Sequence, residues 1–251
     1  MRFTDKVAVV TGSGSVRGIG RETALLLAEE GARVVVADMN LEGARSVSEE
    51  IEAKGRAAIF VQVDITDETS VKAMVDAAVA KYGRLDILVN NAGITQPITT
   101  MKMTAEDFQR IVRVNLFGTY LCSRAAIPEM AKNRYGRIVN LSSVSGKRGG
   151  GVYGGSHYSA AKAGILGFSK ALAREVVDDG ITVNCVCPGL VATDMRAGIS
   201  DEKEHAMWET IPMRRPASAR EIANTIAFLA SDDASYITGE DIDVNGGSHM
   251  D

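Results

Sequence analysis

The fold is constrained most strongly by a strict alternation of short apolar runs with longer stretches of helical periodicity. The apolar runs show little polar–apolar alternation, which is typical of strands buried on both faces of a sheet. They cover residues 6–11, 33–37, 57–63, 85–89, 137–141, 182–187 and 241–244. Apolar residues at helical spacing lie between them, in residues 21–30, 41–54, 69–82, 104–133, 158–177 and 217–230. With no linker or internal repeat, this order predicts an α/β protein with one doubly wound parallel sheet of about seven strands and a single domain over residues 1–251.

Composition and charge exclude several classes of partner. The chain has 251 residues, 45% of them hydrophobic, and a formal net charge of −4 with both signs interspersed. We expect neither nucleic acid nor a membrane as partner, because no concentrated positive charge is present. No apolar stretch is long enough for a signal peptide core or a bilayer span, so we expect a cytoplasmic protein. Cys122, Cys185 and Cys187 are interpreted as buried thiols in a reducing compartment, and we assign no metal.

A glycine-rich stretch joins the first predicted strand to the first predicted helix. Glycines there let backbone amides at a helix N-terminus approach a pyrophosphate closely. The next strand ends at Asp38, about twenty residues further on, where a dinucleotide site places its ribose-binding carboxylate. We infer a dinucleotide site in a Rossmann-type sheet. Its glycines are Gly12, Gly14, Gly18 and Gly20, and the spacing leaves open whether Gly12 or Gly14 is the first glycine of the motif.

Tyr158 and Lys162 lie four residues apart at the start of a predicted helix, so their side chains share one face. A free phenol titrates near pH ~10, and an adjacent ammonium favours the phenolate. We therefore expect Lys162 to lower the pKa of Tyr158 and make it a general acid/base. Taken alone, the spacing equally describes an ordinary helix face. Ser143, at the end of an apolar run, adds a hydroxyl that could meet Tyr158 over one substrate oxygen.

Several motifs, in order along residues 5–247, resemble those of the short-chain dehydrogenase/reductase family. They are Thr11-Gly12 with Gly18-Ile19-Gly20, Asn90-Asn91-Ala92-Gly93, Ser143, Tyr158-x-x-x-Lys162 and Pro188-Gly189. Residues 231–239 and 244–247 are similar to the 3-oxoacyl-ACP reductase-like branch, which also contains dehydrogenases of unrelated small alcohols. The resemblance therefore leaves the substrate open.

The resemblance implies a role for each matching residue. Tyr158 would be the acid/base, Lys162 would hold the nicotinamide ribose, and Ser143 would hydrogen-bond the substrate oxygen. Asn115 matches the family's fourth catalytic position and would organise a water that links Lys162 to solvent. The residues expected to bind the cofactor are Gly12, Gly14, Arg17, Gly18, Ile19, Gly20, Asp38, Asp64, Ile65, Asn91, Ala92, Gly93, Tyr158, Lys162, Pro188, Gly189, Val191 and Thr193.

These residues predict an enzyme that transfers a hydride between NAD(H) and a small secondary alcohol or ketone. Asp38 favours NAD(H), because its carboxylate would repel the 2′-phosphate of NADP(H), whereas Arg17 favours NADP(H). An NADPH-dependent 3-oxoacyl-ACP reductase is the first alternative. The acidic residues Glu175 and 178–179 argue against it, since they dilute the positive charge that an acidic carrier protein needs. A non-catalytic dinucleotide-sensing protein is the alternative from another class.

Two further expectations concern the surface. Residues 190–216 are the least regular stretch, with Gly198, Pro212 and Pro216, and we expect this segment to cover the substrate. Family resemblance also implies a homotetramer. The helix predicted over residues 158–177 offers small residues that a partner helix could approach closely, namely Ala161, Ala163, Gly164, Gly167 and Ala171.

Overall fold

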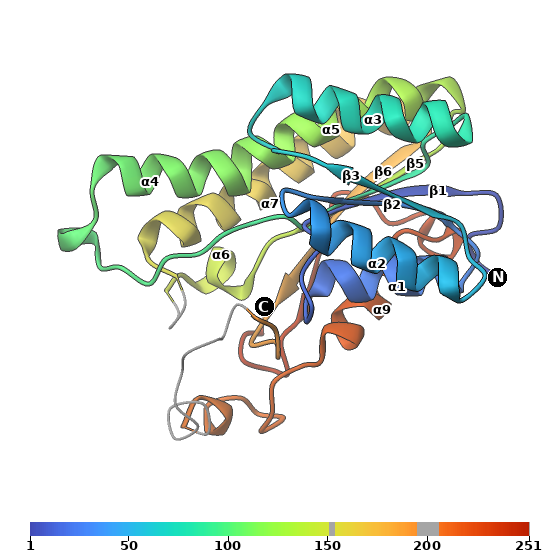
Figure 1. Cartoon of the computed structure of the whole chain (residues 1–251). Coiled ribbons are helices and arrows are strands. Elements are labelled where there is room, and N and C mark those ends of the chain that lie inside the picture. Colours follow the sequence, from blue (N-terminus) through green and yellow to red (C-terminus); the bar gives the residue numbers. More distant parts are fainter. Residues whose placement is uncertain (151–153, 195–205, 251) are drawn as a thin grey trace.

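A seven-stranded sheet runs through the middle of the molecule (Figure 1). Its strands are β1 (Val7–Thr11), β2 (Arg33–Asp38), β3 (Ala58–Gln62), β4 (Ile87–Asn90), β5 (Gly136–Leu141), β6 (Ile181–Pro188) and β7 (Asp241–Val244). Every neighbouring pair is parallel, in the order β3-β2-β1-β4-β5-β6-β7. The computed structural model, which describes residues 1–150, 154–194 and 206–250, confirms the predicted α/β class and the doubly wound sheet.

Strand β1 shows why the sequence contains unbroken apolar runs. Val7 and Val9 belong to the core on one side of the sheet, whereas Ala8 and Val10 belong to the core on the other. Successive side chains of a strand point to opposite faces, and all four of these residues are fully buried. A strand covered on both faces requires an apolar residue at each position.

Helices cover both faces of this sheet (Figure 1). One core lies under α1 (Ile19–Glu29), α2 (Leu41–Ala53) and α9 (Ala219–Leu229). The opposite core lies under α3 (Glu68–Tyr82), α5 (Gly118–Lys132) and α7 (Ser156–Val176). The observed helix ends agree with the predicted ones to within a few residues.

Capping residues explain where two of these helices begin and end. The Asp67 side chain accepts a hydrogen bond of 2.7 Å from Ser70 N at the start of α3. Gly83 ends that helix in the left-handed region at φ 79°, which glycine adopts without steric cost. At the start of α9, Ser218 and Glu221 cap each other's backbone amides reciprocally.

The stretch 104–133, predicted as one helical stretch, is interrupted in the structure. Helix α4 (Ala105–Val112) ends in a π-helical turn at Arg113–Phe117, and α5 then continues through Pro128. The irregular turn therefore lies well before the proline. A π-helical turn inserts an extra residue into a helix and is common at functional sites, and this one contains Asn115.

Two other segments bear on the site. A short helix, α6 (Val144–Arg148), follows Ser143 in a stretch for which no helix was predicted. The predicted covering segment 190–216 lies partly outside the described residues, because 195–205 are not among them.

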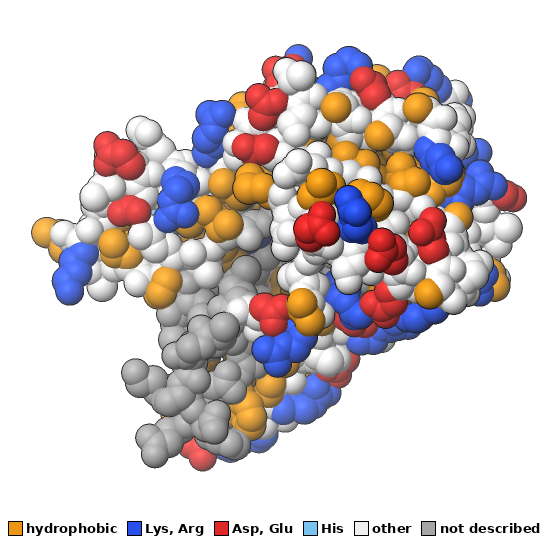
Figure 2. Space-filling view, in the orientation of Figure 1, with side chains coloured by type: hydrophobic (Ala, Val, Ile, Leu, Met, Phe, Trp, Pro, Cys, Tyr) orange, Lys and Arg blue, Asp and Glu red, His pale blue; other side chains and the backbone are white. Residues whose placement is uncertain are grey.

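Basic and acidic side chains are interspersed over the face shown in Figure 2. Within the described ranges, the longest helices are too short or too polar to cross a lipid bilayer. All three cysteines are buried free thiols, as predicted.

Candidate functional site

A cavity of about 780 Å³ opens at the carboxyl ends of strands β1 to β6. Its wall includes Gly12 after β1, Asp38 at the end of β2, Asn91 after β4, Ser143 after β5 and Gly189 after β6. Strand order reverses between β1 and β4, and ligands of open α/β sheets bind at such a switch point. The parallel topology therefore brings together residues from many parts of the chain.

The glycine loop shapes one side of this cavity. Gly12 has φ +65°, and a Cβ atom there would lie 2.6 Å from the Ala92 Cα atom. Gly18 is the N-cap of α1 and provides no side-chain cap, so the first turn of α1 keeps unsatisfied amides at the cavity. A close, unobstructed approach to a helix N-terminus fits the pyrophosphate of a dinucleotide.

Most of the residues expected to bind a cofactor line the cavity, and three do not. Gly20 packs directly under the Gly12 carbonyl, where a side chain would not fit. Gly14 donates its amide to Asp38 Oδ2 at 2.8 Å. Asp64 Oδ1 accepts hydrogen bonds from Thr66, while the adjacent Ile65 reaches the cavity. The lining residues that were predicted are Gly12, Arg17, Gly18, Ile19, Asp38, Ile65, Asn91, Ala92, Gly93, Asn115, Ser143, Tyr158, Lys162, Pro188, Gly189, Val191 and Thr193.

Asn91 holds the glycine loop in place. Its side-chain Nδ2 donates to the carbonyl oxygens of Thr11 at 2.9 Å and Gly12 at 2.8 Å. The Thr11 hydroxyl in turn accepts from the backbone amides of Asn91 and Ala92. These reciprocal bonds join the loops after β1 and β4, so Asn91 both lines the cavity and positions the loop.

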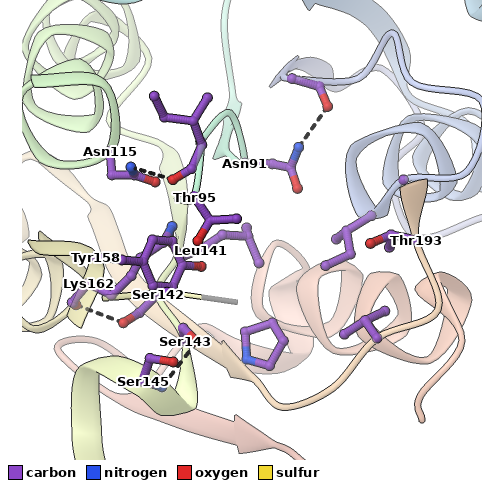
Figure 3. A pocket seen from close by; sticks show the side chains of 18 of the residues that line it. Asn91, Thr95, Asn115, Leu141, Ser142, Ser143, Ser145, Tyr158, Lys162 and Thr193 are labelled. Carbon is purple, nitrogen blue, oxygen red and sulfur yellow. Dashed lines mark hydrogen bonds between the residues drawn. The ribbon is translucent and has the colours of Figure 1, made fainter. Parts of the chain in front are cut away.

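Ser143, Tyr158, Lys162 and Asn115 gather at one side of the cavity, away from Thr193 (Figure 3). Ser143 is the N-cap of α6, and Tyr158 lies in the first turn of α7. Lys162 Nζ lies 5.7 Å from the centre of the Tyr158 ring and donates to Leu141 O at 2.7 Å. The predicted set is therefore brought together by three separate elements.

Asn115 enters from the π-helical turn. Its Nδ2 donates to Ile94 O and Ile111 O, both at 2.9 Å. Its Oδ1 is buried and has no hydrogen-bond partner in the described part of the chain. A Cβ atom at Gly93 would lie 2.5 Å from this Oδ1 and 3.6 Å from Lys162 Nζ. The glycine thus allows an unused acceptor and a buried ammonium to face the same small space.

Burial controls the protonation of both titratable groups. It raises the pKa of Tyr158 to about 12, and a hydrogen bond with the Ser143 side chain offsets this only partly. Burial lowers the pKa of Lys162 to about 8. The expectation that Lys162 would lower the phenol pKa is not met in this structure, because desolvation dominates and the ammonium is turned toward Leu141 O.

A buried chain of hydrogen bonds fixes the helices that carry these side chains. Asn90 Nδ2, in β4, donates to Asn140 Oδ1 at 2.8 Å and to Ser123 Oγ, in α5, at 3.0 Å. Asn140 Nδ2, in β5, donates to Ser169 Oγ, in α7, at 2.8 Å. Helices α5 and α7 are therefore tied to the sheet beneath the site by polar contacts of defined geometry.

Sequence reasoning missed several lining residues. Asp194 binds Arg17 across the cavity, and Arg148 and Ser248 meet where α6 approaches the C-terminal segment. No short-range pattern could have paired these residues, since each contact joins distant parts of the chain. Leu190, Met207 and Ile211 line the cavity from the described part of the predicted covering segment 190–216. The remaining unpredicted lining residues include the apolar side chains of Met39, Val63, Ile94, Val114 and Val144.

A Rossmann-type sheet whose dinucleotide groove leads to serine, tyrosine and lysine side chains defines a nicotinamide-dependent oxidoreductase. Comparison with known proteins gives the family. A family model described as enoyl-(acyl carrier protein) reductase matches residues 12–249. An uncharacterized short-chain type dehydrogenase/reductase of Sinorhizobium fredii is 46% identical over 249 residues, which is 98% of each chain. The chain therefore belongs to the short-chain dehydrogenase/reductase family.

Other relatives carry a more specific name. The 3-oxoacyl-[acyl-carrier-protein] reductase of Escherichia coli is 44% identical over 250 residues, and that of Staphylococcus aureus is 46% identical over 254, each with 100% of both chains covered. The protein is thus an NAD(P)-dependent oxidoreductase acting on CH–OH groups. This finding disfavours the non-catalytic sensor.

Proposed function

We propose that the protein interconverts a small secondary alcohol and its ketone, with NAD(H) as the hydride partner. The observation that carries the proposal is the meeting of Ser143, Tyr158, Lys162 and Asn115 at one end of a cavity that also presents Asp38. When bound, the nicotinamide supplies or accepts the hydride. The protein's own residues handle the substrate oxygen and its proton.

Tyr158 is proposed as the general acid/base. A phenol with a pKa of about 12 is protonated at neutral pH, which is the form that donates a proton during ketone reduction. The Ser143 hydroxyl, hydrogen-bonded to the phenol, would hold the substrate oxygen beside it. Alcohol oxidation uses the same path in reverse, and the Tyr158 phenolate then accepts the proton.

Lys162 and Asn115 are proposed to support that proton transfer. Lys162, one helical turn beyond Tyr158, would hold the cofactor ribose. Its charge would stabilise the phenolate once the ammonium turns from Leu141 O toward the Tyr158 hydroxyl. The unused Asn115 Oδ1 adjoins Gly93 and Lys162, where it would hold a water that returns the proton to Lys162.

Asp38 supports NAD(H) over NADP(H). Its carboxylate is fixed by the amides of Gly14 at 2.8 Å and Asn40 at 2.9 Å, so it cannot swing away without losing both bonds. Two unit charges ~4 Å apart interact by ~4 kcal/mol at an effective dielectric of ~20, and a fraction of that gives tenfold discrimination. The test is kcat/KM with each cofactor; equal or higher efficiency with NADPH would contradict the proposal.

A free small molecule is proposed as the substrate, in preference to an acyl chain on a carrier protein. An acidic carrier needs an exposed basic surface. Four basic residues could form one. Lys132 pairs with Glu129 and Arg137 with Asp232, whereas Arg134 binds the neutral carbonyl oxygen of Asp178 and Arg174 is followed by the acidic Glu175. Two of the four positive charges are therefore already paired with carboxylates, which weakens the attraction of a carrier.

The carrier-dependent reductase is the second candidate, favoured by relatives that are 44% and 46% identical and bear that name. A direct comparison separates the two. A short 3-oxoacyl thioester with NADPH and a panel of small hydroxy and keto compounds with NADH are assayed side by side. If the thioester with NADPH is the best pair by a wide margin, the reductase is the right assignment.

The proposal includes a cytoplasmic location. The three cysteines are buried and free, which fits a reducing compartment. Fractionation of the source cells would place the protein in the soluble cytoplasmic fraction.

A further inference from the structure

We propose that Asp194 is a second determinant of cofactor choice. It forms an ion pair with Arg17, the one cation of the glycine loop, and so keeps that guanidinium from binding the 2′-phosphate of NADP(H). The inference rests on the NAD(H) preference proposed above and adds a residue to it. It concerns the contact between Arg17 and Asp194.

Three hydrogen bonds join the two residues. The Arg17 amide donates to Asp194 Oδ2 at 2.8 Å, and Arg17 Nε donates to Asp194 Oδ1 at 2.9 Å. The Asp194 amide donates back to Arg17 O at 3.0 Å. Both carboxylate oxygens are used, and backbone atoms take part on each side. This contact holds Asp194 in one orientation, unlike an ion pair between two flexible side chains.

The pair spans the cofactor groove. Arg17 lies in the glycine loop between β1 and α1, whereas Asp194 lies beyond β6, and both line the cavity. The hydrogen bonds from Arg17 keep the pKa of the Asp194 carboxyl below its usual value, so the carboxylate is charged at any pH at which the enzyme would be assayed.

The distribution of charge along the cavity makes Arg17 the residue that decides whether a 2′-phosphate is attracted. The other basic residues among its described lining are Arg148 and Lys162, and both lie toward Ser143 and Tyr158. Arg17 is therefore the cation nearest the glycine loop in that set. Asp38 and Asp194 also line the cavity, and each contributes a negative charge. A 2′-phosphate thus meets a net negative charge until Arg17 is released from Asp194.

An exposed ion pair is weak, so its effect on affinity is moderate. The Arg17 and Asp194 side chains keep 74% and 38% of their exposure. Removing the Asp194 charge both releases the guanidinium and deletes a repulsive carboxylate. Together these changes should tighten binding of a 2′-phosphate by about three- to tenfold.

The experiment isolates the 2′-phosphate from the rest of the cofactor. Adenosine 2′,5′-bisphosphate and 5′-AMP are titrated by calorimetry into the full-length protein, with no turnover required. Asp194→Asn keeps the shape and one acceptor for the Arg17 amide while removing the charge. It should bind the bisphosphate about three- to tenfold more tightly than the unaltered protein and bind 5′-AMP equally well.

Arg17→Ala and the double variant Arg17→Ala/Asp194→Asn are the matched controls. The gain should be clearly smaller when Arg17 is absent, since only the loss of the repulsive carboxylate then remains. Unchanged affinity in Asp194→Asn would overturn the proposal, as would a gain of the same size without Arg17. Loss of affinity for both nucleotides would also overturn it, because Asp194 would then only hold the loop together.

These outcomes are separate from the fate of the proposed NAD(H) preference. That preference is read from the unaltered protein with NADH and NADPH, whereas this inference is read from the change that Asp194→Asn produces. Asp38→Asn supplies an independent reference, and its gain should combine multiplicatively with that of Asp194→Asn if the two carboxylates act separately.

Discussion

At the scale of single residues, the cost of burying a charge governs the candidate site. Tyr158 gains a high pKa from burial, and Lys162 gains a low one from the same cause. Each group is therefore held in the neutral form more strongly than in water. Proton transfer between substrate and solvent then depends on neighbouring groups that stabilise the Tyr158 phenolate and the Lys162 ammonium as they form.

Tyr158→Phe should fold, bind nucleotide and lose nearly all turnover, because the ring still packs while its proton is absent. Steady-state kinetics together with 5′-AMP titration would measure both properties. Tyr135→Phe is the matched control: Tyr135 is also a partly buried phenol, hydrogen-bonded to Asp232, but it does not line the cavity. Substantial activity in Tyr158→Phe would remove Tyr158 from its proposed role.

Lys162 should leave a signature in stability against pH. Its pKa falls from 10.5 in the unfolded chain to about 8 in the folded protein. Between those values only the unfolded state binds the proton, so this lysine makes the folded state more stable as pH rises. Below pH 8 the lysine lowers the stability of the folded protein relative to its effect at pH 10.5, because the folded state must then bury a charged ammonium.

Lys162→Met lacks this pH-dependent contribution to the free energy of unfolding. The stability of the variant relative to the unaltered protein should therefore fall by roughly 3 kcal/mol between pH 7 and pH 10.5, at about 1.4 kcal/mol per pKa unit. Urea unfolding at several pH values measures the difference. The buried thiols, whose pKa values are raised, are present in both proteins and cancel. A difference independent of pH would show that Lys162 is protonated equally in both states.

Which residues could be foreseen depends on the range of their contacts. Tyr158 and Lys162 were predictable because helical spacing alone places them on one face. The hydrogen-bond partner of Lys162 could not be predicted, since the ammonium donates to Leu141 O on strand β5 instead of facing the Tyr158 hydroxyl. The same limit applies to Asp194, which meets Arg17 only after the chain has crossed the sheet.

At the scale of elements, α6 and α7 must pack almost backbone to backbone. A Cβ atom at Gly146 would lie 2.7 Å from the Lys162 carbonyl carbon and 2.8 Å from Ala163 N. The Ser142 hydroxyl bonds to Lys162 O at 2.8 Å in the same region. This contact sets the separation between Ser143, at the start of α6, and the side chains on α7.

Gly146→Ala should therefore push α6 away from α7 and separate Ser143 from Tyr158. We expect kcat to fall at least tenfold and stability to fall by about 1–3 kcal/mol, as overpacking usually costs. Kinetics and thermal unfolding measure the two effects. Binding of 5′-AMP, at the other end of the cavity, is the internal control and should persist. Unaltered kcat would mean that the helices can separate without harm.

The elements that could be predicted are those whose pattern is repeated over many residues. The buried strands and the amphipathic helices have such patterns, and their order alone implied a parallel sheet. The π-helical turn around Asn115 and the short helix α6 had none. Both arise where tertiary contacts at the cavity override local preference, as functional segments often do.

At the scale of the whole molecule, an exposed apolar face lies across α5 and α7. Phe117 and Tyr120 remain 39% and 37% exposed, and the Tyr120 ring contacts Phe168 of α7 at 6.2 Å. Ala163, Gly167 and Ala171 are exposed or open on α7, whereas Ala161 is buried and Gly164 faces Leu116 within the chain. Only part of the predicted small-residue surface is thus available to a partner.

We propose a homotetramer that uses this face, and light scattering at micromolar concentration should report four times the chain mass. Gly167→Arg should give smaller species, because no atom lies within 4 Å of a Cβ there and the new side chain would enter the interface. Ala53→Arg, on the exposed end of α2, is the matched control and should not alter the mass. A monomer mass for the unaltered protein would exclude the tetramer.

Helix α1 is packed against α9, which forms from almost the last part of the chain. Leu25 and Leu27 of α1 share a core with Ile222 and Ile226 of α9, and Arg220 pairs with Glu29. During synthesis, the side of α1 that packs against α9 therefore stays uncovered until nearly the entire polypeptide has been made. We expect chains that stop early to expose this apolar surface to chaperones and proteases.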